Sequence, residues 1–195
     1  MARWLGVDVG VRKGLDIAVV DERQLILLAS GQGVADVVRA AGTHRPAVVA
    51  VDSPRSCAPR GERARACELA LNRAVCGIRW TPDEDTVNAG AYYRWIVCGR
   101  AVYEALERGG VDAIEVFPTA SWTRWHGPRD GRSRASWSTA ALAALGVEGV
   151  PTRTNQDQRD AIAAAVTARE HTHGRSELFG EIVVPAAHLR PTPIV

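Results

Sequence analysis

Short apolar runs separated by turn residues occupy the start of the chain. Residues 3–9, 15–20 and 24–29 are rich in aliphatic and β-branched side chains, and glycines or the charged tripeptide 21–23 lie between them. Apolar runs of this length joined by tight turns are typical of antiparallel strands. The sequence therefore predicts a three-stranded antiparallel meander.

The next segments indicate a crossover from this meander to parallel strands. Residues 34–43 carry valine and alanine at helical spacing, residues 47–51 are a continuous apolar run, and residues 113–117 are an apolar run with Glu115 inside it. Continuous apolar strands are typical of parallel sheets, because both faces of such sheets are covered. We therefore expect a helix at 34–43 followed by two parallel strands.

The remaining segments predict further helices and one late strand. Apolar residues recur at helical spacing over 87–108, and shorter helices are expected at 136–145 and 157–172. A loop is expected at 121–134 and a short strand at 181–185. This order predicts an α/β fold: a mixed five-stranded sheet of three antiparallel strands and then parallel strands, flanked by helices.

Length and composition agree with one globular domain over residues 1–195. A hydrophobic fraction of 46% and a charged fraction of 24% exclude a disordered or collagen-like chain. No apolar run approaches the roughly 18 residues of a membrane span, and the N-terminus has no signal-peptide pattern. We expect a cytoplasmic protein without a membrane partner; its oligomeric state stays open.

Five acidic residues occupy settings that are unusual for acids. Asp8 lies inside an apolar strand, Asp52 ends another, Glu115 interrupts a third, and Asp157 and Asp160 share one face of a predicted helix. Burying an unpaired carboxylate costs several kcal/mol or raises its pKa until it is neutral. A divalent cation such as Mg²⁺ stabilises carboxylates gathered at one end of a sheet. Two such ions roughly 4 Å apart would clamp a phosphodiester during hydrolysis.

Each acid also has a simpler interpretation when taken alone. Asp8 could cap a turn, Asp52 could be a strand-end turn residue, and Asp157 could be a helix N-cap. Glu115 could pair with a neighbouring arginine. The joint order of the acids along the predicted elements is more specific than any one of them.

That order is the ribonuclease H-like arrangement, and several motifs carry a closer resemblance. Over nearly its whole length the chain resembles the bacterial DUF429 family of predicted nucleases, which have a ribonuclease H-like fold. The matching stretches are Gly6–Gly10 with Lys13-Gly14, Val51–Pro54, Ile114–Pro118, Asp160–Ala165 and Gly180–Pro185.

The resemblance implies a role for each acid. It makes Asp8, Asp52 and Asp160 metal-binding residues and matches Glu115 to an acid on the family's fifth strand, so these four residues are the expected catalytic set. Asp157, a further candidate metal ligand, stands where Holliday-junction-resolvase-like relatives carry an acid or a histidine. The implied function is hydrolysis of nucleic-acid phosphodiester bonds, in DNA or RNA, with Mg²⁺ or Mn²⁺ as cofactor.

Basic residues gather in two arginine-rich insertions, near 55–83 and 121–134. Of the 24 basic residues only Lys13 is lysine, and a GC-rich genome explains that preference most simply. Residues 53–80 nevertheless hold six arginines against two acids, and residues 119–139 hold four against one. Each stretch follows a strand that supplies a candidate acid, so both are expected to project over the same edge of the sheet.

These stretches supply the candidate contacts to nucleic acid. Guanidinium groups bind phosphate bidentately, and aromatic rings stack on unpaired bases. Trp122 and Trp137 could instead pack as core, and the arginines could form an ordinary solvated face. The candidate contact residues are Lys13, Arg55, Arg60, Arg63, Arg124, Arg129, Trp122 and Trp125.

Two other functions are compatible with the same fold. An actin-like or sugar-kinase-type phosphotransferase would need a glycine-rich phosphate loop near the fifth strand, where this chain has Glu115–Thr119 without a glycine pair. That function is therefore disfavoured. A catalytically silent module that binds nucleic acid or protein would follow if the acid set were incomplete.

Overall fold

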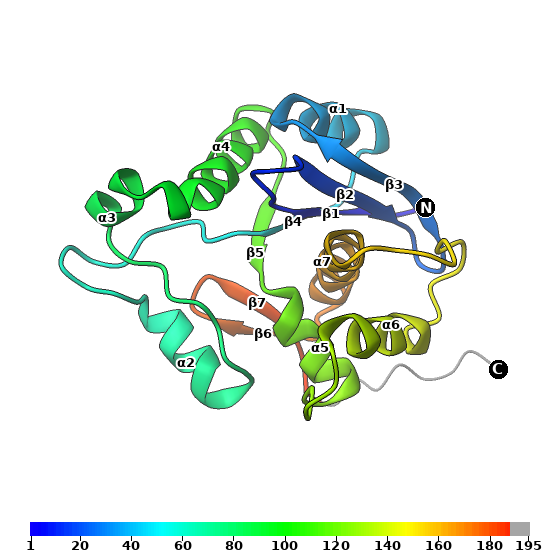
Figure 1. Cartoon of the computed structure of the whole chain (residues 1–195). Helices are drawn as coiled ribbons and strands as arrows, with labels where there is room; N and C mark the ends of the chain where they lie inside the picture. Colours follow the sequence, from blue (N-terminus) through cyan, green and yellow to red (C-terminus); the bar gives the residue numbers. More distant parts are fainter. Residues whose placement is uncertain (188–195) are drawn as a thin grey trace.

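The computed structural model describes residues 1–187, which fold around one seven-stranded mixed sheet (Figure 1). The strands are β1 (Trp4–Asp8), β2 (Leu15–Val20), β3 (Leu25–Gln32), β4 (Val49–Asp52), β5 (Ala113–Val116), β6 (Ser176–Phe179) and β7 (Ile182–Pro185). Their order in the sheet is β3-β2-β1-β4-β5-β7-β6. The pairs β1–β2, β2–β3 and β6–β7 are antiparallel, and the other pairs are parallel. The predicted mixed α/β sheet is confirmed.

The prediction of five strands was wrong because a hairpin extends the sheet beyond β5. The late strand predicted at 181–185 is β7, and it pairs in parallel with β5. Gly180, with φ +56°, allows the tight turn that joins β6 to β7. Only four residues long and half polar, β6 lacks a sequence pattern that would mark it as a strand. Residues 188–195, which the predicted domain includes, lie outside the described residues.

The helices cover both faces of the sheet. They are α1 (Val34–His44), α2 (Ala66–Ala74), α3 (Glu84–Ala89), the 3₁₀ helix η1 (Ala91–Tyr93), α4 (Arg94–Arg108), α5 (Pro118–His126), α6 (Arg134–Ala144) and α7 (Gln156–Thr172). One face packs on α1 and α4, and the other packs on α5, α6 and α7. No helix within residues 1–187 has the length and apolar content needed to cross a bilayer.

Two predicted elements differ from the structure. The single helix expected at 87–108 is divided into α3, η1 and α4, since the chain is extended at Gly90. The loop expected at 121–134 is largely helical in its first part, because Pro118 provides a favourable first helical residue for α5.

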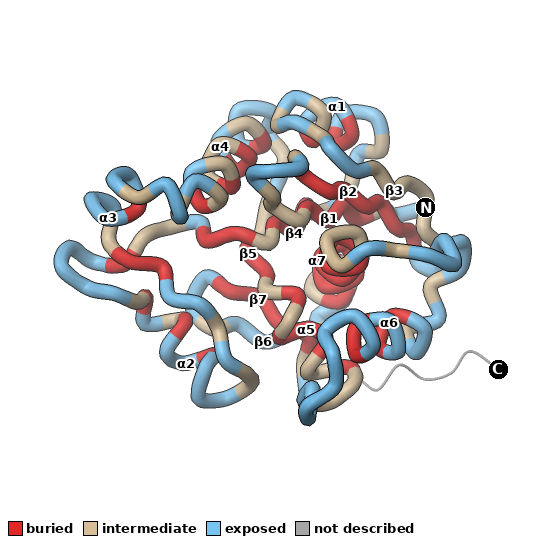
Figure 2. The backbone as a smooth tube through the Cα atoms, in the orientation of Figure 1, coloured by how far each residue is buried: buried red, intermediate tan, exposed pale blue. Residues whose placement is uncertain are grey.

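Helix α7 packs unusually close to the central strand β1. A Cβ atom on Gly6 would overlap the carbonyl oxygen of Ala161 and the backbone nitrogen of Ala165. Glycine on the strand and alanines on the helix therefore allow the two backbones to approach. Figure 2 shows that α7 is buried along most of its length. This contact fixes the start of α7 against the carboxyl ends of β1 and β4.

Candidate functional site

Three aspartates lie side by side at one edge of the sheet. Asp8 lies opposite Asp16 in the antiparallel pairing of β1 with β2, and opposite Asp52 in the parallel pairing of β1 with β4. Strand partners in register project from the same face of a sheet, which is here the face covered by α7. The strand pairing thus places Asp8 between two other acids.

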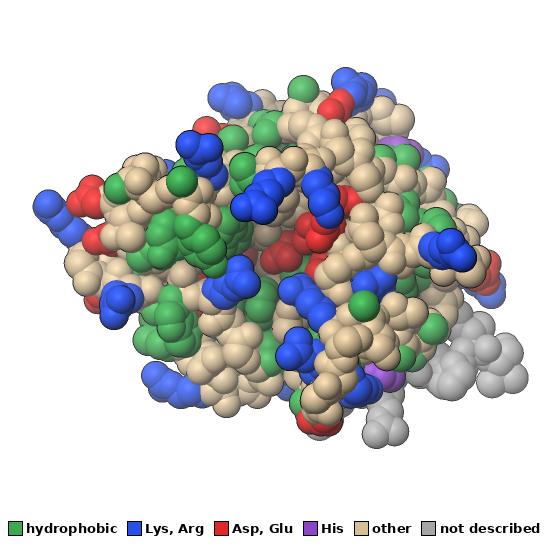
Figure 3. All heavy atoms as spheres, in the orientation of Figure 1, with side chains coloured by type: hydrophobic (Ala, Val, Ile, Leu, Met, Phe, Trp, Pro, Cys, Tyr) green, Lys and Arg blue, Asp and Glu red, His purple; other side chains and the backbone are tan. Residues whose placement is uncertain are grey.

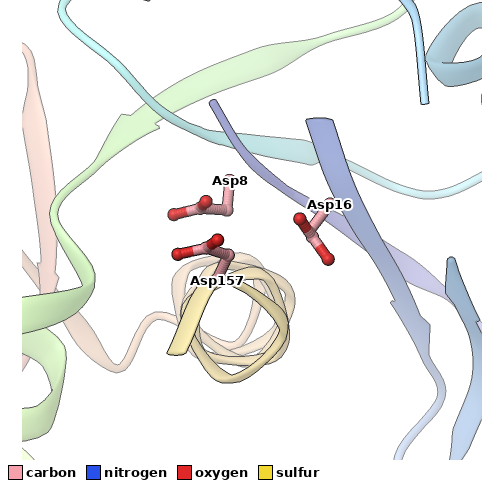
Figure 4. Close-up of side chains that lie close together, drawn as sticks. All are labelled: Asp8, Asp16 and Asp157. Carbon is pink, nitrogen blue, oxygen red and sulfur yellow. The ribbon is translucent and has the colours of Figure 1, made fainter. Parts of the chain in front are cut away.

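Helix α7 brings two further carboxylates to this edge. It begins after Asn155, whose side chain accepts a backbone N–H of the first turn, so the N-cap is Asn155 and not Asp157. Carboxylate oxygens of Asp8, Asp16 and Asp157 lie within 4.8 Å of one another. Figure 4 shows these three side chains close together, two from the strands and one from α7. Asp160 follows one turn later and is buried.

The acids at this edge raise one another's pKa. Burial raises the pKa of Asp8 well above its usual value, and the nearby charges of Asp52, Asp160, Asp157 and Asp16 raise it further. Burial also raises the pKa of Asp52, and the charge of Asp160 acts in the same direction. A bound cation would remove this repulsion and favour the charged carboxylates.

Asp160 is held by three hydrogen-bond donors. The indole N–H of Trp122 donates to Oδ1 at 2.8 Å, and Arg134 donates to Oδ2 at 2.8 Å. The Gln156 amide donates to both oxygens, at 2.9 and 3.0 Å. Burial raises the pKa of Asp160 overall, although the three donors act against that rise. The donors also fix the orientation of this carboxylate.

The prediction that Trp122 and Trp125 stack on bases is wrong, because both are buried. Trp122 has no exposed surface, and its ring meets that of Trp125 edge to face at 5.5 Å in the core shared with α7. The alternative that Trp122 and Trp137 pack as core is confirmed. Trp122 contributes to the site only through its hydrogen bond to Asp160.

Glu115 belongs to a buried ion-pair network. Arg65, at the start of α2, donates to both carboxylate oxygens of Glu115, at 2.5 and 2.9 Å. The backbone N–H of Arg55 donates to one of these oxygens at 2.8 Å. Arg65 also pairs with Glu68 and Glu181, each at 3.1 Å. The interpretation of Glu115 as a partner of an arginine is confirmed, and the network holds α2 against the sheet.

A pocket of about 670 Å³ lies at this edge of the sheet. Figure 3 shows acidic side chains in a hollow near the centre of the view, with basic side chains around it. Its charged lining residues are Asp8, Asp52, Glu68, Glu115, Asp157, Asp160, Arg65, Arg79 and Arg134. The pocket therefore combines an acidic floor with cationic groups that could hold phosphate.

None of the residues predicted to contact nucleic acid is among the described residues that line this pocket. The Nζ of Lys13 is 3.9 Å from Oδ2 of Asp157, and the side chain is largely exposed. Arg63 lines a second groove, together with Trp80 and Tyr92. Arg129 is exposed in the turn between α5 and α6.

Three other predicted arginines contact the protein itself. Arg55 donates to the Ala113 carbonyl at 3.0 Å, and its guanidinium lies 5.3 Å from the centre of the Tyr103 ring. Arg60 lies 3.7 Å from Asp85, and Arg124 pairs with Glu177 on β6. Their contacts with nucleic acid stay a prediction.

Sequence reasoning missed Asp16 and did not single out two arginines of the basic stretches that line the pocket. Asp16 interrupts the apolar run 15–20 just as Asp8 interrupts its own strand, so the same criterion could have found it. Arg79 and Arg134 lie inside the two basic stretches, but nothing in their local pattern separates them from the neighbouring arginines.

The sheet order and the position of the acids define the class of this protein. An antiparallel meander followed by parallel strands, with acids on β1, β4 and the last long helix, is a ribonuclease H-like architecture. The chain belongs to the DUF429 family (Protein of unknown function), whose sequence profile matches residues 6–183. The resemblance identified from the motifs is confirmed.

Two solved structures share this fold. Thermus thermophilus RuvC is 18% identical, with a TM-score of 0.51, and the match covers 88% of this chain and 96% of that one. T. thermophilus RuvC in complex with a Holliday junction substrate is also 18% identical, with a TM-score of 0.57 and coverage of 89% and 97%. No curated protein matches the chain. At this identity the likeness establishes the fold alone.

Proposed function

We propose that this protein is a nuclease that hydrolyses nucleic-acid phosphodiester bonds with the help of Mg²⁺ or Mn²⁺. The observation that carries the proposal is the group of carboxylates at the ends of β1, β2, β4 and the start of α7. Asp8 and Asp52 are acids without an arginine or lysine within ion-pair distance in residues 1–187. Mg²⁺ and Mn²⁺ prefer oxygen ligands of this kind.

The donor set fits a divalent cation. Asp8, Asp16 and Asp157, whose oxygens lie within 4.8 Å of one another, would hold it, and the predicted ligands Asp52 and Asp160 line the same pocket. When bound, such an ion supplies Lewis-acid stabilisation of the charge that develops on the attacked phosphate. Hydrolysis consumes one water, whose oxygen bonds to phosphorus while the bond to the leaving oxygen breaks and that oxygen takes up a proton.

The chain's own residues would bind and orient the substrate. Arg79 and Arg134 line the pocket and would hold the phosphates that flank the scissile bond. Arg134 also fixes Asp160 together with Trp122, which keeps that carboxylate aimed into the pocket. Glu115, expected from the sequence to be catalytic, would act as a positioning residue, because its carboxylate holds the guanidinium group of Arg65 at the pocket.

Cleavage assays test the proposal. Single-stranded, duplex and four-way branched DNA and RNA are incubated with Mg²⁺, with Mn²⁺ or with EDTA. We expect cleavage with either metal, none in EDTA, and at least a hundredfold loss in Asp8→Asn. Glu104→Gln, which removes an exposed carboxylate on α4, is the matched control and should cleave like the wild type.

Two results would contradict the proposal. Cleavage that is unchanged in Asp8→Asn would locate the chemistry elsewhere. Absence of cleavage with every substrate and both metals would leave a module that binds without cutting, the function favoured by the saturated hydrogen bonding of Asp160.

A further inference from the structure

A groove lined by aromatic residues adjoins the acidic pocket. It has a volume of about 710 Å³ and lies between the irregular segment 76–82 and the region of η1 and α4. Ile78, Arg79 and Trp95 line both the groove and the acidic pocket, so the two spaces are continuous. In Figure 3, hydrophobic side chains gather beside the acidic hollow, over the position of α3 and α4 in Figure 1.

The aromatic rings of this groove are open to solvent. Trp80 is 41% exposed and Tyr92 is 60% exposed, although rings of this size are usually buried for most of their surface. Tyr92 meets Tyr93 edge to face at 5.1 Å, and Arg79 donates to its hydroxyl at 3.0 Å. The rings are therefore held in place by neighbours while part of their surface stays open.

Two arginines of the groove have guanidinium groups available for phosphate, beside two acids. Arg63 and Arg79 line the groove, and neither forms an ion pair within residues 1–187. The acids Glu62 and Asp83 also line it, and the carboxylate of Asp83 accepts the backbone N–H groups of Gly61 and Thr86. Unpaired guanidinium groups next to open aromatic rings suit the phosphate and the base of a nucleotide, respectively.

We propose that this groove binds unpaired nucleotides of a strand whose backbone continues into the acidic pocket. An aromatic side chain stacks only on a base whose face is open, and in a duplex the neighbouring base pairs cover those faces. The inference rests on the proposed nuclease function and specifies its substrate class as nucleic acid with a single-stranded region. Stacking and phosphate contact do not separate DNA from RNA, so the test includes both.

Binding measured in EDTA tests this inference without cleavage. Fluorescence anisotropy compares labelled oligo(dT) and oligo(U) with blunt-ended DNA and RNA duplexes of the same length, all at one salt concentration. We expect tighter binding of single strands than of duplexes. Trp80→Ala and Tyr92→Ala should each weaken single-strand binding about 5- to 100-fold, the range expected for losing one stacked base.

Conservative variants and a matched control separate stacking from loss of structure. Trp80→Phe and Tyr92→Phe keep a ring and should retain most of the affinity. Leu178→Ala removes another exposed apolar side chain, on β6 outside the groove, and should bind like the wild type. Thermal melting of each variant checks that the fold is kept.

Three results would overturn the inference. They are equal affinity for single strands and duplexes, wild-type binding by the double variant Trp80→Ala/Tyr92→Ala, and sedimentation showing a dimer that only this double variant loses. The last result would make the groove a contact between two copies. If the wild type cleaves nothing yet binds single strands through these rings, the nuclease proposal fails while the groove keeps its role.

Discussion

Asp8 has a carboxylate neighbour on each adjacent strand and two more on the helix above it. Its burial and these four charges raise its pKa in the same direction, and no arginine or lysine lies within ion-pair distance in residues 1–187. Such an arrangement lowers the stability of the metal-free protein, as is common where a site is built for a charged ligand.

A substitution at Asp8 should therefore stabilise the metal-free fold. We expect Asp8→Asn to raise the free energy of unfolding by about 1–2 kcal/mol in EDTA, because it removes a buried acid from a group of like charges. Urea unfolding near neutral pH measures the change. The control Glu104→Gln, on the exposed side of α4, should stay within about 0.5 kcal/mol of the wild type. A lower free energy of unfolding for Asp8→Asn than for the wild type would contradict the claim that repulsion between the carboxylates destabilises the metal-free protein.

Asp16 should contribute to cation binding although the sequence reasoning passed over it. Its carboxylate lies opposite Asp8 and accepts a hydrogen bond from the Ser30 hydroxyl. We expect Asp16→Asn to weaken Mn²⁺ binding about 10- to 100-fold by calorimetry. Ser30→Ala, which keeps the carboxylate, should have a smaller effect. Unchanged affinity in Asp16→Asn would show that this acid is only structural.

At the scale of elements, the contact of α7 with β1 positions the helix-borne acids. The strand supplies Gly6, the helix supplies a run of alanines, and the close approach places Asp157 and Asp160 near Asp8. The positions of the Asp157 and Asp160 carboxylates thus depend on the backbone contact between Gly6 and α7.

Gly6→Ala should disrupt this contact. Its Cβ would overlap backbone atoms of Ala161 and Ala165, so α7 must move, at a cost of about 3 kcal/mol in unfolding free energy. Chemical denaturation measures the loss. Gly42→Ala on α1, where nothing lies within 4 Å of the added methyl group, should instead stabilise the protein by about 0.5–1 kcal/mol. Equal effects of the two substitutions would contradict the close approach.

The turn between β2 and β3 should make stability depend on pH. Burial alone would raise the pKa of Asp21, but hydrogen bonds from the backbone N–H groups of Arg23 and Gln24 outweigh it, and the pKa is lowered. A carboxyl with a lowered folded-state pKa stabilises above its unfolded pKa of 3.8 and loses that effect as pH falls through the folded value.

Asp21→Ala should therefore destabilise the protein by about 1 kcal/mol near neutral pH. The difference from the wild type should shrink as pH falls below the unfolded pKa, which urea unfolding over a pH series measures. Asp112→Ala, with an exposed side chain, is the control. A difference that is constant down to acidic pH would contradict the assigned role.

At the scale of the whole molecule, local periodicity predicted the elements that are long or strongly apolar. The meander, the strands ending at Asp52 and Val116 and the last long helix follow from it. The hairpin β6–β7 did not, because β6 is short and polar and gains its order from pairing with β7. The arginine-rich region around α2 was beyond local reasoning, since Arg65 meets Glu115 fifty positions away.

In the candidate site, too, some residues could be predicted from local sequence and others only from tertiary contacts. Asp8 and Asp52 were predicted because they interrupt or end an apolar run, and Asp157 and Asp160 because they share one face of a predicted helix. The structure brings all four into one pocket. Burial of Trp122 depends on the packing of α5 against α7, which no local pattern reveals. Local sequence thus indicated the acids, and only the tertiary structure distinguished exposed rings from buried ones.

The most direct test of the central claim is the anomalous scattering of Mn²⁺ in crystals of the wild type and of Asp8→Asn. We predict a peak bounded by the carboxylates of Asp8, Asp16 and Asp157 in the wild type, and no peak there in the variant. Mn²⁺ bound elsewhere on the protein, with the pocket between these carboxylates left empty, would contradict the account.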